Sequence, residues 1–346
     1  MQHDRQDWID SAKGIGILLV VIGHATTGRV YDLIYLFHMP LFFIIAGLVF
    51  RPAPMPTYLL RRARTLLVPY TSFLVALTVA EALLDIRSGR SLPQVEAALQ
   101  SALLPEIYGG RQLVGDFGAF WFVPSLFTAL CAYNLLRRWL GAPATPRMLV
   151  AMAVLFLAAY PLGPLETPWN LTVNPMAMVF IWIGDLWSTL LGLQPVQESA
   201  AGGRRLWPDS PPVLALAVAT AAIGIAFAAP FDMKFGVYGT PLLSALNAVA
   251  LSHLHLTACR HLCHHRPFAP IFRRLTVPLG LSSIVILFLH RFFVLHLLAR
   301  LPVPAVIAIA TAIPFLAWLA LRRGGSLVRF LFLGDPPPPL RRPASP

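Results

Sequence analysis

Three titratable side chains stand at the start of the first apolar segment, in the stretch DSAKGIGILLVVIGH. Asp10 and Lys13 precede the apolar run, and His24 lies inside it. Eleven residues separate Lys13 from His24, which in an α-helix is three turns plus about 20°, so the two side chains share one face. Asp10 lies about 40° away from His24. The rise of roughly 16 Å puts His24 near the middle of a bilayer core about 30 Å thick when Lys13 lies at its rim.

An ionisable residue in the middle of a membrane must face protein or a water-filled cavity, and it indicates a functional site. Because imidazole titrates near neutral pH, His24 suits proton transfer. The alternative is a neutral histidine that is hydrogen-bonded to a neighbouring helix. Lys13 also has an alternative explanation, since a lysine at a helix end extends its long side chain to the water.

The composition is that of an integral membrane protein. Of the 346 residues, 57% are hydrophobic and 12% are charged, and the mean hydropathy is +0.69, values far from those of a soluble domain. With about 20 residues in each span, the apolar runs predict an all-α protein with about ten transmembrane helices. These lie near residues 14–30, 34–50, 65–85, 118–136, 147–162, 170–191, 212–229, 240–258, 276–298 and 304–321.

Lysine and arginine are concentrated in alternate predicted loops and at both ends of the chain. Since cytoplasmic loops collect basic residues, both termini are expected in the cytoplasm, and the net charge of +12 needs no nucleic acid partner. Three cysteines are too few, and odd in number, for a disulfide framework. We expect one polytopic domain over residues 1–332 and a Pro-rich, disordered cytoplasmic tail over residues 333–346.

Five ordered motifs resemble those of the acyltransferase-3 family of membrane-bound O-acyltransferases, and in particular its fucose 4-O-acetylase-like branch. The first is the opening stretch, where Lys13 and His24 are similar to the Arg/Lys-x10-His signature of the family. The others are FHMPLFFIIAGLVF at 37–50, RRARTLLVPY with Arg61 and Arg64, FWFVPSLF with Trp121, Phe122 and Pro124, and LGLSSIVILFLH with Gly280, Ser283 and His290.

Two positions depart from the pattern of the family. Lysine at position 13 replaces the commoner arginine, which leaves a point charge without bidentate geometry. Ala46 stands where many relatives have serine, and this excludes a serine nucleophile at that position.

The resemblance implies an enzyme that transfers an acetyl group from cytoplasmic acetyl-CoA to a sugar hydroxyl. The implied acceptor is a bacterial exopolysaccharide, a lipopolysaccharide or a lipid-linked precursor, and the implied location is the bilayer of the bacterial inner membrane. His24 would be the general base, with Lys13 and Asp10 holding the cytoplasmic approach. The expected substrate-binding residues are His38, Arg61, Arg64, Trp121, Ser283 and His290. No metal is expected, and the oligomeric state is left open.

Several of these residues also have structural explanations. The guanidinium groups of Arg61, Arg62 and Arg64 suit the phosphates of an acyl-CoA, but a basic cytoplasmic loop carries such residues for topological reasons alone. Trp121 suits either stacking on a substrate or a place in the interfacial aromatic belt. His38 either shapes the acceptor site or makes a structural hydrogen bond.

Other classes of protein remain as alternatives. A transporter or flippase of sugars or lipids is the principal one, because many helices with intramembrane His and Arg also suit a proton-coupled carrier. The five motifs count against it, as does the lack of an internal repeat. A polysaccharide polymerase would carry a larger outward loop than residues 86–117. A zinc site is disfavoured, since the spacing in CRHLCHH at 259–265 matches no usual structural zinc pattern.

Overall fold

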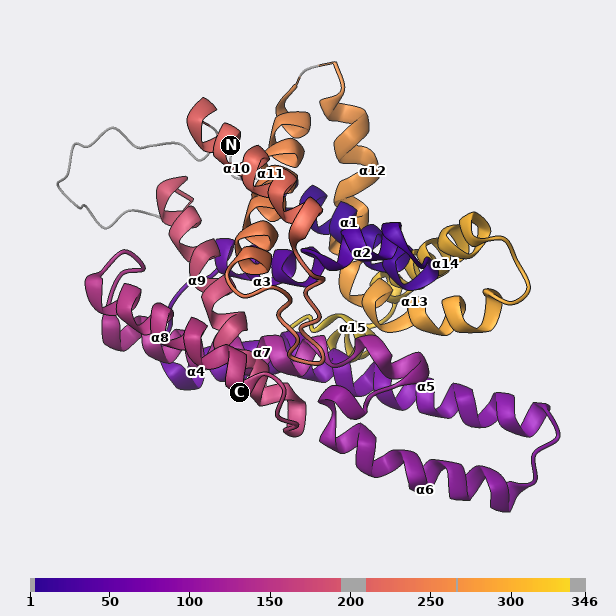
Figure 1. Ribbon diagram of the computed structural model, residues 1–346. Helices are drawn as coiled ribbons and strands as arrows, with labels where there is room; N and C mark the ends of the chain where they lie inside the picture. The colour runs from indigo at the N-terminus through magenta and orange to yellow at the C-terminus, as the bar shows by residue number, and fades with distance from the viewer. Residues whose placement is uncertain (1–3, 194–209, 266, 337–346) are drawn as a thin grey trace, which may run out of the picture.

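The computed structural model describes residues 4–193, 210–265 and 267–336, and within these ranges the secondary structure is helical apart from one isolated bridge between Asp232 and Val237 (Figure 1). The α-helices are α1 (Asp4–Ala25), α2 (Arg29–Tyr35), α3 (His38–Leu48), α4 (Met55–Arg62), α5 (Val68–Arg87), α6 (Leu92–Tyr108), α7 (Phe122–Leu140), α8 (Pro146–Leu162), α9 (Asn174–Leu190), α10 (Pro211–Phe227), α11 (Leu243–His264), α12 (Ala269–Leu281), α13 (Ser283–Leu297), α14 (Val303–Arg323) and α15 (Ser326–Leu333). A π-helical turn, η1 (Ala63–Leu67), joins α4 to α5, and short 3-10 turns are η2 (Gly110–Gln112), η3 (Gly115–Ala119) and η4 (Pro168–Val173).

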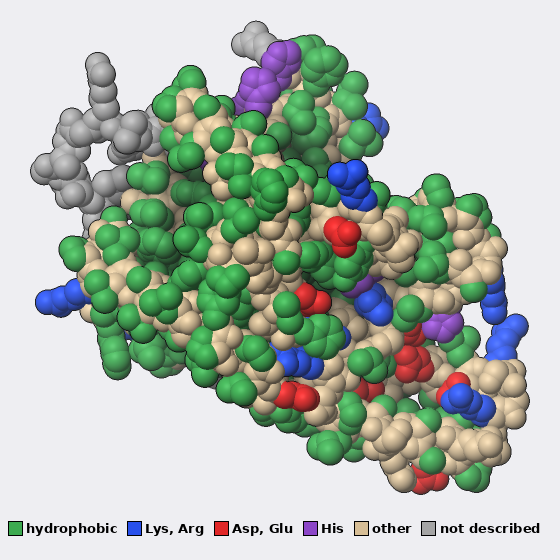
Figure 2. Space-filling view, in the orientation of Figure 1, with side chains coloured by type: hydrophobic (Ala, Val, Ile, Leu, Met, Phe, Trp, Pro, Cys, Tyr) green, Lys and Arg blue, Asp and Glu red, His purple; other side chains and the backbone are tan. Residues whose placement is uncertain are grey.

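Among the described residues, five helical segments are long and apolar enough to cross a membrane, and they are Asp7–Ala25, Arg29–Leu48, Met55–Arg87, Gly115–Leu140 and Val303–Arg323. The pair α12 and α13 makes a sixth if it counts as one bent span. Hydrophobic side chains cover most of the face shown in Figure 2, and charged side chains gather mainly in its lower right half. The chain is therefore an all-α membrane protein, as its composition predicts.

Each of the ten predicted apolar ranges contains a helix, but the count of ten spans and the cytoplasmic position of the termini stay predictions. Helices α8, α9 and α10 have 17 residues each, fewer than the roughly 20 residues of a straight span. Helix α11 has 22 residues, but its last turn carries two histidines. The boundary of the proposed tail also stays a prediction, because residues 337–346 lie outside the described residues.

Two predicted straight helices are broken in the structure. The range 34–50 divides into α2 and α3, because Pro40 cannot donate a backbone hydrogen bond and is tolerated only in the first turn of a helix. The range 276–298 bends by 76° between α12 and α13. Pro278 lies inside α12 and weakens its last turn. After this bend, α13 runs in a new direction and begins at Ser283.

Helix α1 is the centre of the bundle and packs against α12, α11, α13 and α3. Its closest approach is to α12, where a Cβ atom at Gly14 would overlap the carbonyl oxygen of Thr276. A Cβ atom at Gly280 would in turn overlap the carbonyl oxygen of Asp10. Small residues allow two helix backbones to approach closely in a membrane protein. Gly280, which belongs to the last of the five motifs, thus positions the start of α13 beside α1.

Helices α7 and α9 are joined by a buried ion pair. Asp185 on α9 is fully buried and accepts hydrogen bonds from the Tyr133 hydroxyl at 2.8 Å and from Nε of Arg137 at 2.7 Å. Arg137 also donates to the carbonyl of Gly141 at 2.6 Å. Because the pair is largely removed from water, losing one charge leaves the other without compensation.

Asp185→Ala is therefore expected to destabilise the protein by about 3 to 5 kcal/mol and to lower its Tm in detergent by roughly 5 °C or more. Asp85→Ala is the matched control, because Asp85 pairs with Arg90 at an exposed position where an ion pair contributes little. Thermal unfolding followed by tryptophan fluorescence compares the two variants. Equal Tm values would show that the buried pair does not stabilise the contact between α7 and α9.

Candidate active site

One face of α1 lines two adjoining chambers inside the helix bundle. Lys13 and Ile17 line the first chamber, Val20 lines both, and His24 lines the second. These residues follow one another at intervals of four, three and four positions, which is the spacing of a single helix face. Lys13 and His24 thus lie on one face of α1, as their spacing predicts.

The first chamber, here called the apolar chamber, has a volume of about 250 Å³. Its polar lining consists of Lys13, Arg62 and Ser283 among the described residues, and the remaining lining is hydrophobic. The ammonium group of Lys13 lies 2.5 Å from a carboxylate oxygen of Asp10. This ion pair holds the lysine at the wall of the chamber, although Asp10 itself does not line it.

The second chamber, here called the polar chamber, also has a volume of about 250 Å³. Side chains from α1, α2, α3, α13, the residues before α7 and the loop between α10 and α11 form its wall. The members with polar side-chain atoms are His24, Tyr31, Tyr35, His38, Trp121, Asp232, Lys234 and Arg291. Two histidines, two cations and one carboxylate therefore face the same space.

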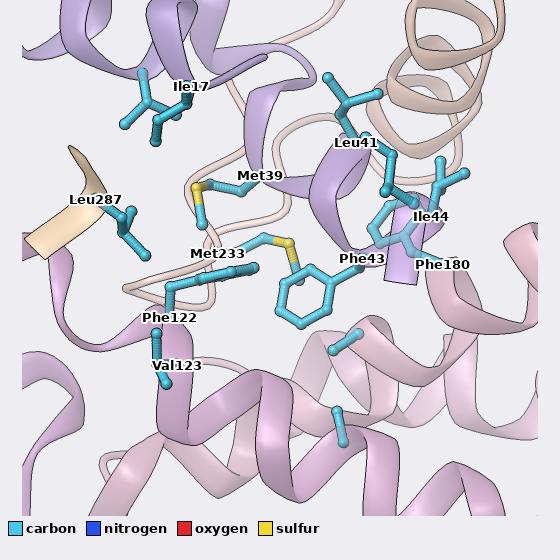
Figure 3. Close-up of a cluster of buried hydrophobic side chains, with 14 of the residues drawn as sticks. Ile17, Met39, Leu41, Phe43, Ile44, Phe122, Val123, Phe180, Met233 and Leu287 are labelled. Carbon is cyan, nitrogen blue, oxygen red and sulfur yellow. The ribbon is translucent and has the colours of Figure 1, made fainter. Parts of the chain in front are cut away.

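The two chambers meet at three buried apolar side chains, Val20, Met39 and Leu287, which line both of them. Figure 3 shows Met39 and Leu287 on either side of a space that Ile17 and Phe122 also border. A substrate that reaches this constriction from the apolar chamber comes close to a substrate held in the polar chamber.

The ring of His24 is held by α13. Nη1 of Arg291 lies 3.1 Å from Nδ1 of His24. Because a guanidinium group can only donate, Nδ1 accepts this hydrogen bond, and a neutral His24 then carries its proton on Nε2. The ring of His290 packs beside it with 5.1 Å between the centroids, and Tyr35 makes an edge contact at 6.4 Å.

In His38 and His290 the roles of the two ring nitrogens are the reverse of those in His24. Nδ1 of His38 lies 3.0 Å from the carbonyl oxygen of Ile34, and Nδ1 of His290 lies 2.9 Å from the carbonyl oxygens of Ile286 and Leu287. A carbonyl oxygen only accepts, so each Nδ1 donates and each Nε2 keeps a lone pair when the ring is neutral. Nε2 of His290 is buried without a hydrogen-bond partner among the described residues.

The residues predicted for the site take four kinds of position. His24, His38 and Trp121 line the polar chamber, Lys13 and Ser283 line the apolar chamber, and Asp10 and His290 support Lys13 and His24 from outside the chambers. Arg61 and Arg64 line neither chamber, whereas their neighbour Arg62 lines the apolar one. The guanidinium group of Arg61 lies instead 5.5 Å from the centre of the Tyr58 ring.

Two charged residues of the polar chamber, Asp232 and Lys234, are not predicted from the sequence. Asp232 and Lys234 come from the loop between α10 and α11, which looks like an ordinary short connection. Their signal is the segment FDMKFG, where two opposite charges interrupt an apolar and Gly-containing loop. Arg291 directly follows His290, and as an ionisable residue deep in the predicted span 276–298 it is expected, like His290, to face the bundle or a cavity. It lines the polar chamber.

The cysteines near CRHLCHH make local contacts. Sγ of Cys263 donates to Oγ of Ser11 at 3.3 Å, and Sγ of Cys259 lies 3.8 Å from Nε2 of His255. In the part of the chain that the structure describes, no group of three or more His, Cys, Asp or Glu side chains is arranged to hold a metal ion.

Together these features define a class, a polytopic α-helical membrane protein in which one helix face lines an apolar and a polar chamber, with a histidine in the polar one. Such an arrangement suits the transfer of a group between two substrates that enter by different routes. The chain belongs to the acyltransferase-3 family, because the model of its acyltransferase domain matches residues 6–332.

One curated relative is the nodulation protein NolL of Sinorhizobium fredii (strain NBRC 101917 / NGR234), which is 27% identical to this chain. The similarity covers 46% of the chain and 45% of the relative, so less than half of the relative's length is matched. No solved structure matches the chain.

Proposed function

We propose that this protein is a multi-pass O-acetyltransferase of the bacterial inner membrane. It transfers the acetyl group of cytoplasmic acetyl-CoA to a sugar hydroxyl of an exopolysaccharide, a lipopolysaccharide or a lipid-linked precursor. The observation that carries the proposal is the single face of α1 that lines both chambers, with Lys13 in one and His24 in the other. Membership of the acyltransferase-3 family supplies the reaction class.

The apolar chamber suits the donor. Lys13 and Arg62 are cations in its wall, and they attract the phosphates of coenzyme A. The hydrophobic lining accepts the long pantetheine arm, which brings the thioester to the constriction at Val20, Met39 and Leu287. We expect a short acyl group, acetyl, to be the one that reaches past the three apolar side chains Val20, Met39 and Leu287.

The polar chamber suits the acceptor. His24 takes the proton of the sugar hydroxyl as its oxygen attacks the thioester carbonyl carbon. The new C–O bond forms, the C–S bond breaks, and the thiolate of coenzyme A leaves and receives the proton from His24. His38, whose Nε2 keeps its lone pair, and Trp121 border the acceptor in this scheme.

The test is genetic and chemical. A strain that lacks the gene should make its surface polysaccharide without the O-acetyl groups that the parent strain carries, as measured by NMR spectroscopy of the purified polymer. The gene in trans should restore them. If the mutant strain instead fails to export polymer that is still acetylated, the transporter or flippase alternative is favoured. An unchanged acetyl content would contradict the proposal.

A further inference from the structure

Two cations border the polar chamber next to His24, and both donate to neutral groups. Lys234 donates from Nζ to the carbonyl oxygens of Leu113 and Gly118. Arg291 donates from Nε to the carbonyl oxygen of Gly115 at 2.8 Å, and from Nη1 to His24. Within residues 4–193, 210–265 and 267–336, no carboxylate forms an ion pair with either cation.

The carboxylates near the chamber are already engaged. Asp232 lines the chamber, but its Oδ1 accepts the backbone N–H of Lys234 at 3.1 Å and that of Phe235 at 3.4 Å. Asp116 is buried, and Oδ2 lies 3.7 Å from Nδ1 of His296. Among the described residues that line the chamber, two cations therefore face a single carboxylate.

Burial disfavours the lysine cation most, and the neighbouring positive charge of Arg291 adds to this effect. Lys234 lies in the loop between α10 and α11, outside the membrane-spanning segments. Burial, and next the positive charge of Arg291, lower the pKa of Lys234 from 10.5 to about 8, although the charge of Asp232 acts in the opposite direction. A neutral occupant of the chamber would leave this repulsion in place, whereas an anion would relieve it.

We propose that Lys234 and Arg291 form an anion subsite for the acceptor, so that the acetylated saccharide carries a carboxylate or a phosphate beside the reacting hydroxyl. The inference rests on the proposed function. Arg291 offers a planar pair of N–H donors, which matches the oxygens of either anion. Because Arg291 also contacts His24, the anion binds next to the base. The acetylated hydroxyl therefore lies on the charged sugar or on its neighbour.

The first experiment separates the acceptor from the donor. Full-length protein in membranes is assayed with acetyl-CoA and with the unacetylated saccharide isolated from the deletion strain. Lys234→Met should raise the KM for the saccharide about tenfold to a hundredfold, and Lys234→Arg should retain most of the affinity. Lys13→Met should instead raise the KM for acetyl-CoA. If Lys234→Met raises the KM for acetyl-CoA and leaves that for the saccharide unchanged, the two cations bind the phosphates of the donor and the inference is overturned.

The second experiment changes the acceptor and needs no variant that could misfold. Chemical reduction of uronate carboxyl groups to alcohols should lower transfer by the wild-type protein if a carboxylate is bound. Phosphatase or mild acid treatment should lower it if a phosphate is bound. Undiminished transfer after both treatments would overturn the inference while leaving the proposed function intact. No transfer to any acceptor by the wild-type protein would contradict the proposed function itself.

The third readout is pH, because Lys234 loses its charge as the pH rises through about 8. The KM of the wild-type protein for the saccharide should rise several-fold between about pH 7 and pH 9, and Lys234→Arg should remove the rise, since guanidinium stays charged. The other charged or titratable groups in and around the chamber are present in both proteins, and they are His24, Tyr31, Tyr35, His38, Glu81, Arg111, Asp116, Asp232, His290, Arg291 and His296. Parallel pH profiles would overturn the role of Lys234.

Discussion

Replacing His24 by alanine is expected to reduce acetyl transfer by about a hundredfold to ten-thousandfold, the usual contribution of a general base. The ring lies in the polar chamber, four residues beyond the constriction at Val20, so no other side chain of α1 can take its place. The loss of activity should appear in kcat and not in the KM for the saccharide, because the saccharide still binds when the base is absent. The measurement is acetyl transfer to the unacetylated saccharide in membranes that contain equal amounts of protein.

His261→Gln is the matched control, since His261 is exposed on α11 and lines neither chamber. It should retain wild-type activity. Added imidazole should partly restore the His24→Ala variant, because the ring-sized space that the substitution leaves opens onto the chamber. Normal acetylation by His24→Ala would rule out His24 as the general base. If His24→Ala keeps full activity and His38→Gln loses it, the role of general base belongs to His38.

The face of α1 could be predicted from the sequence because helical periodicity is a local property. Eleven residues between Lys13 and His24 place both on one face in any straight helix, and α1 contains no proline or break between them. The apolar composition likewise predicts an all-α membrane protein wherever the individual spans begin and end. Backbone geometry and solvent preference therefore determine these features without any knowledge of how the helices pack together.

The rest of the site depends on tertiary packing. Arg62 rather than Arg61 or Arg64 lines the apolar chamber, and the π-helical turn that begins at Ala63 departs from the spacing of an α-helix. Lys234 reaches the polar chamber from a loop whose path depends on helices far away in the sequence. No local pattern specifies such long-range contacts, so the polar chamber could not be predicted as well as the face of α1.

The hydrogen bond between Arg291 and His24 affects whether His24 can accept a proton. A general base needs a lone pair, and the Nδ1 lone pair of His24 is occupied by Nη1 of Arg291. The proposed anion of the acceptor competes for the same guanidinium group. When Arg291 turns to the anion, Nδ1 becomes free to take the proton of the hydroxyl. The acceptor would then activate the base that attacks the donor, which limits the loss of acetyl-CoA to water.

Arg291→Met is accordingly expected to change two rates in opposite directions. Transfer to the saccharide should fall by about a hundredfold, since the anion loses a charged partner. Hydrolysis of acetyl-CoA without saccharide should rise by about tenfold, because a general base that is no longer masked acts on water. Free coenzyme A, detected with a thiol reagent, measures hydrolysis, and acetylated saccharide measures transfer.

Arg300→Met is the matched control for this experiment, because Arg300 is exposed beyond the end of α13 and lines neither chamber. It should leave both rates unchanged. A misfolded Arg291→Met protein would lose both activities, and for that reason the rise in hydrolysis is the informative result. If a well-folded Arg291→Met protein loses transfer without gaining hydrolysis, Arg291 binds the acceptor but does not restrain His24. If it keeps full transfer, Arg291 has neither role.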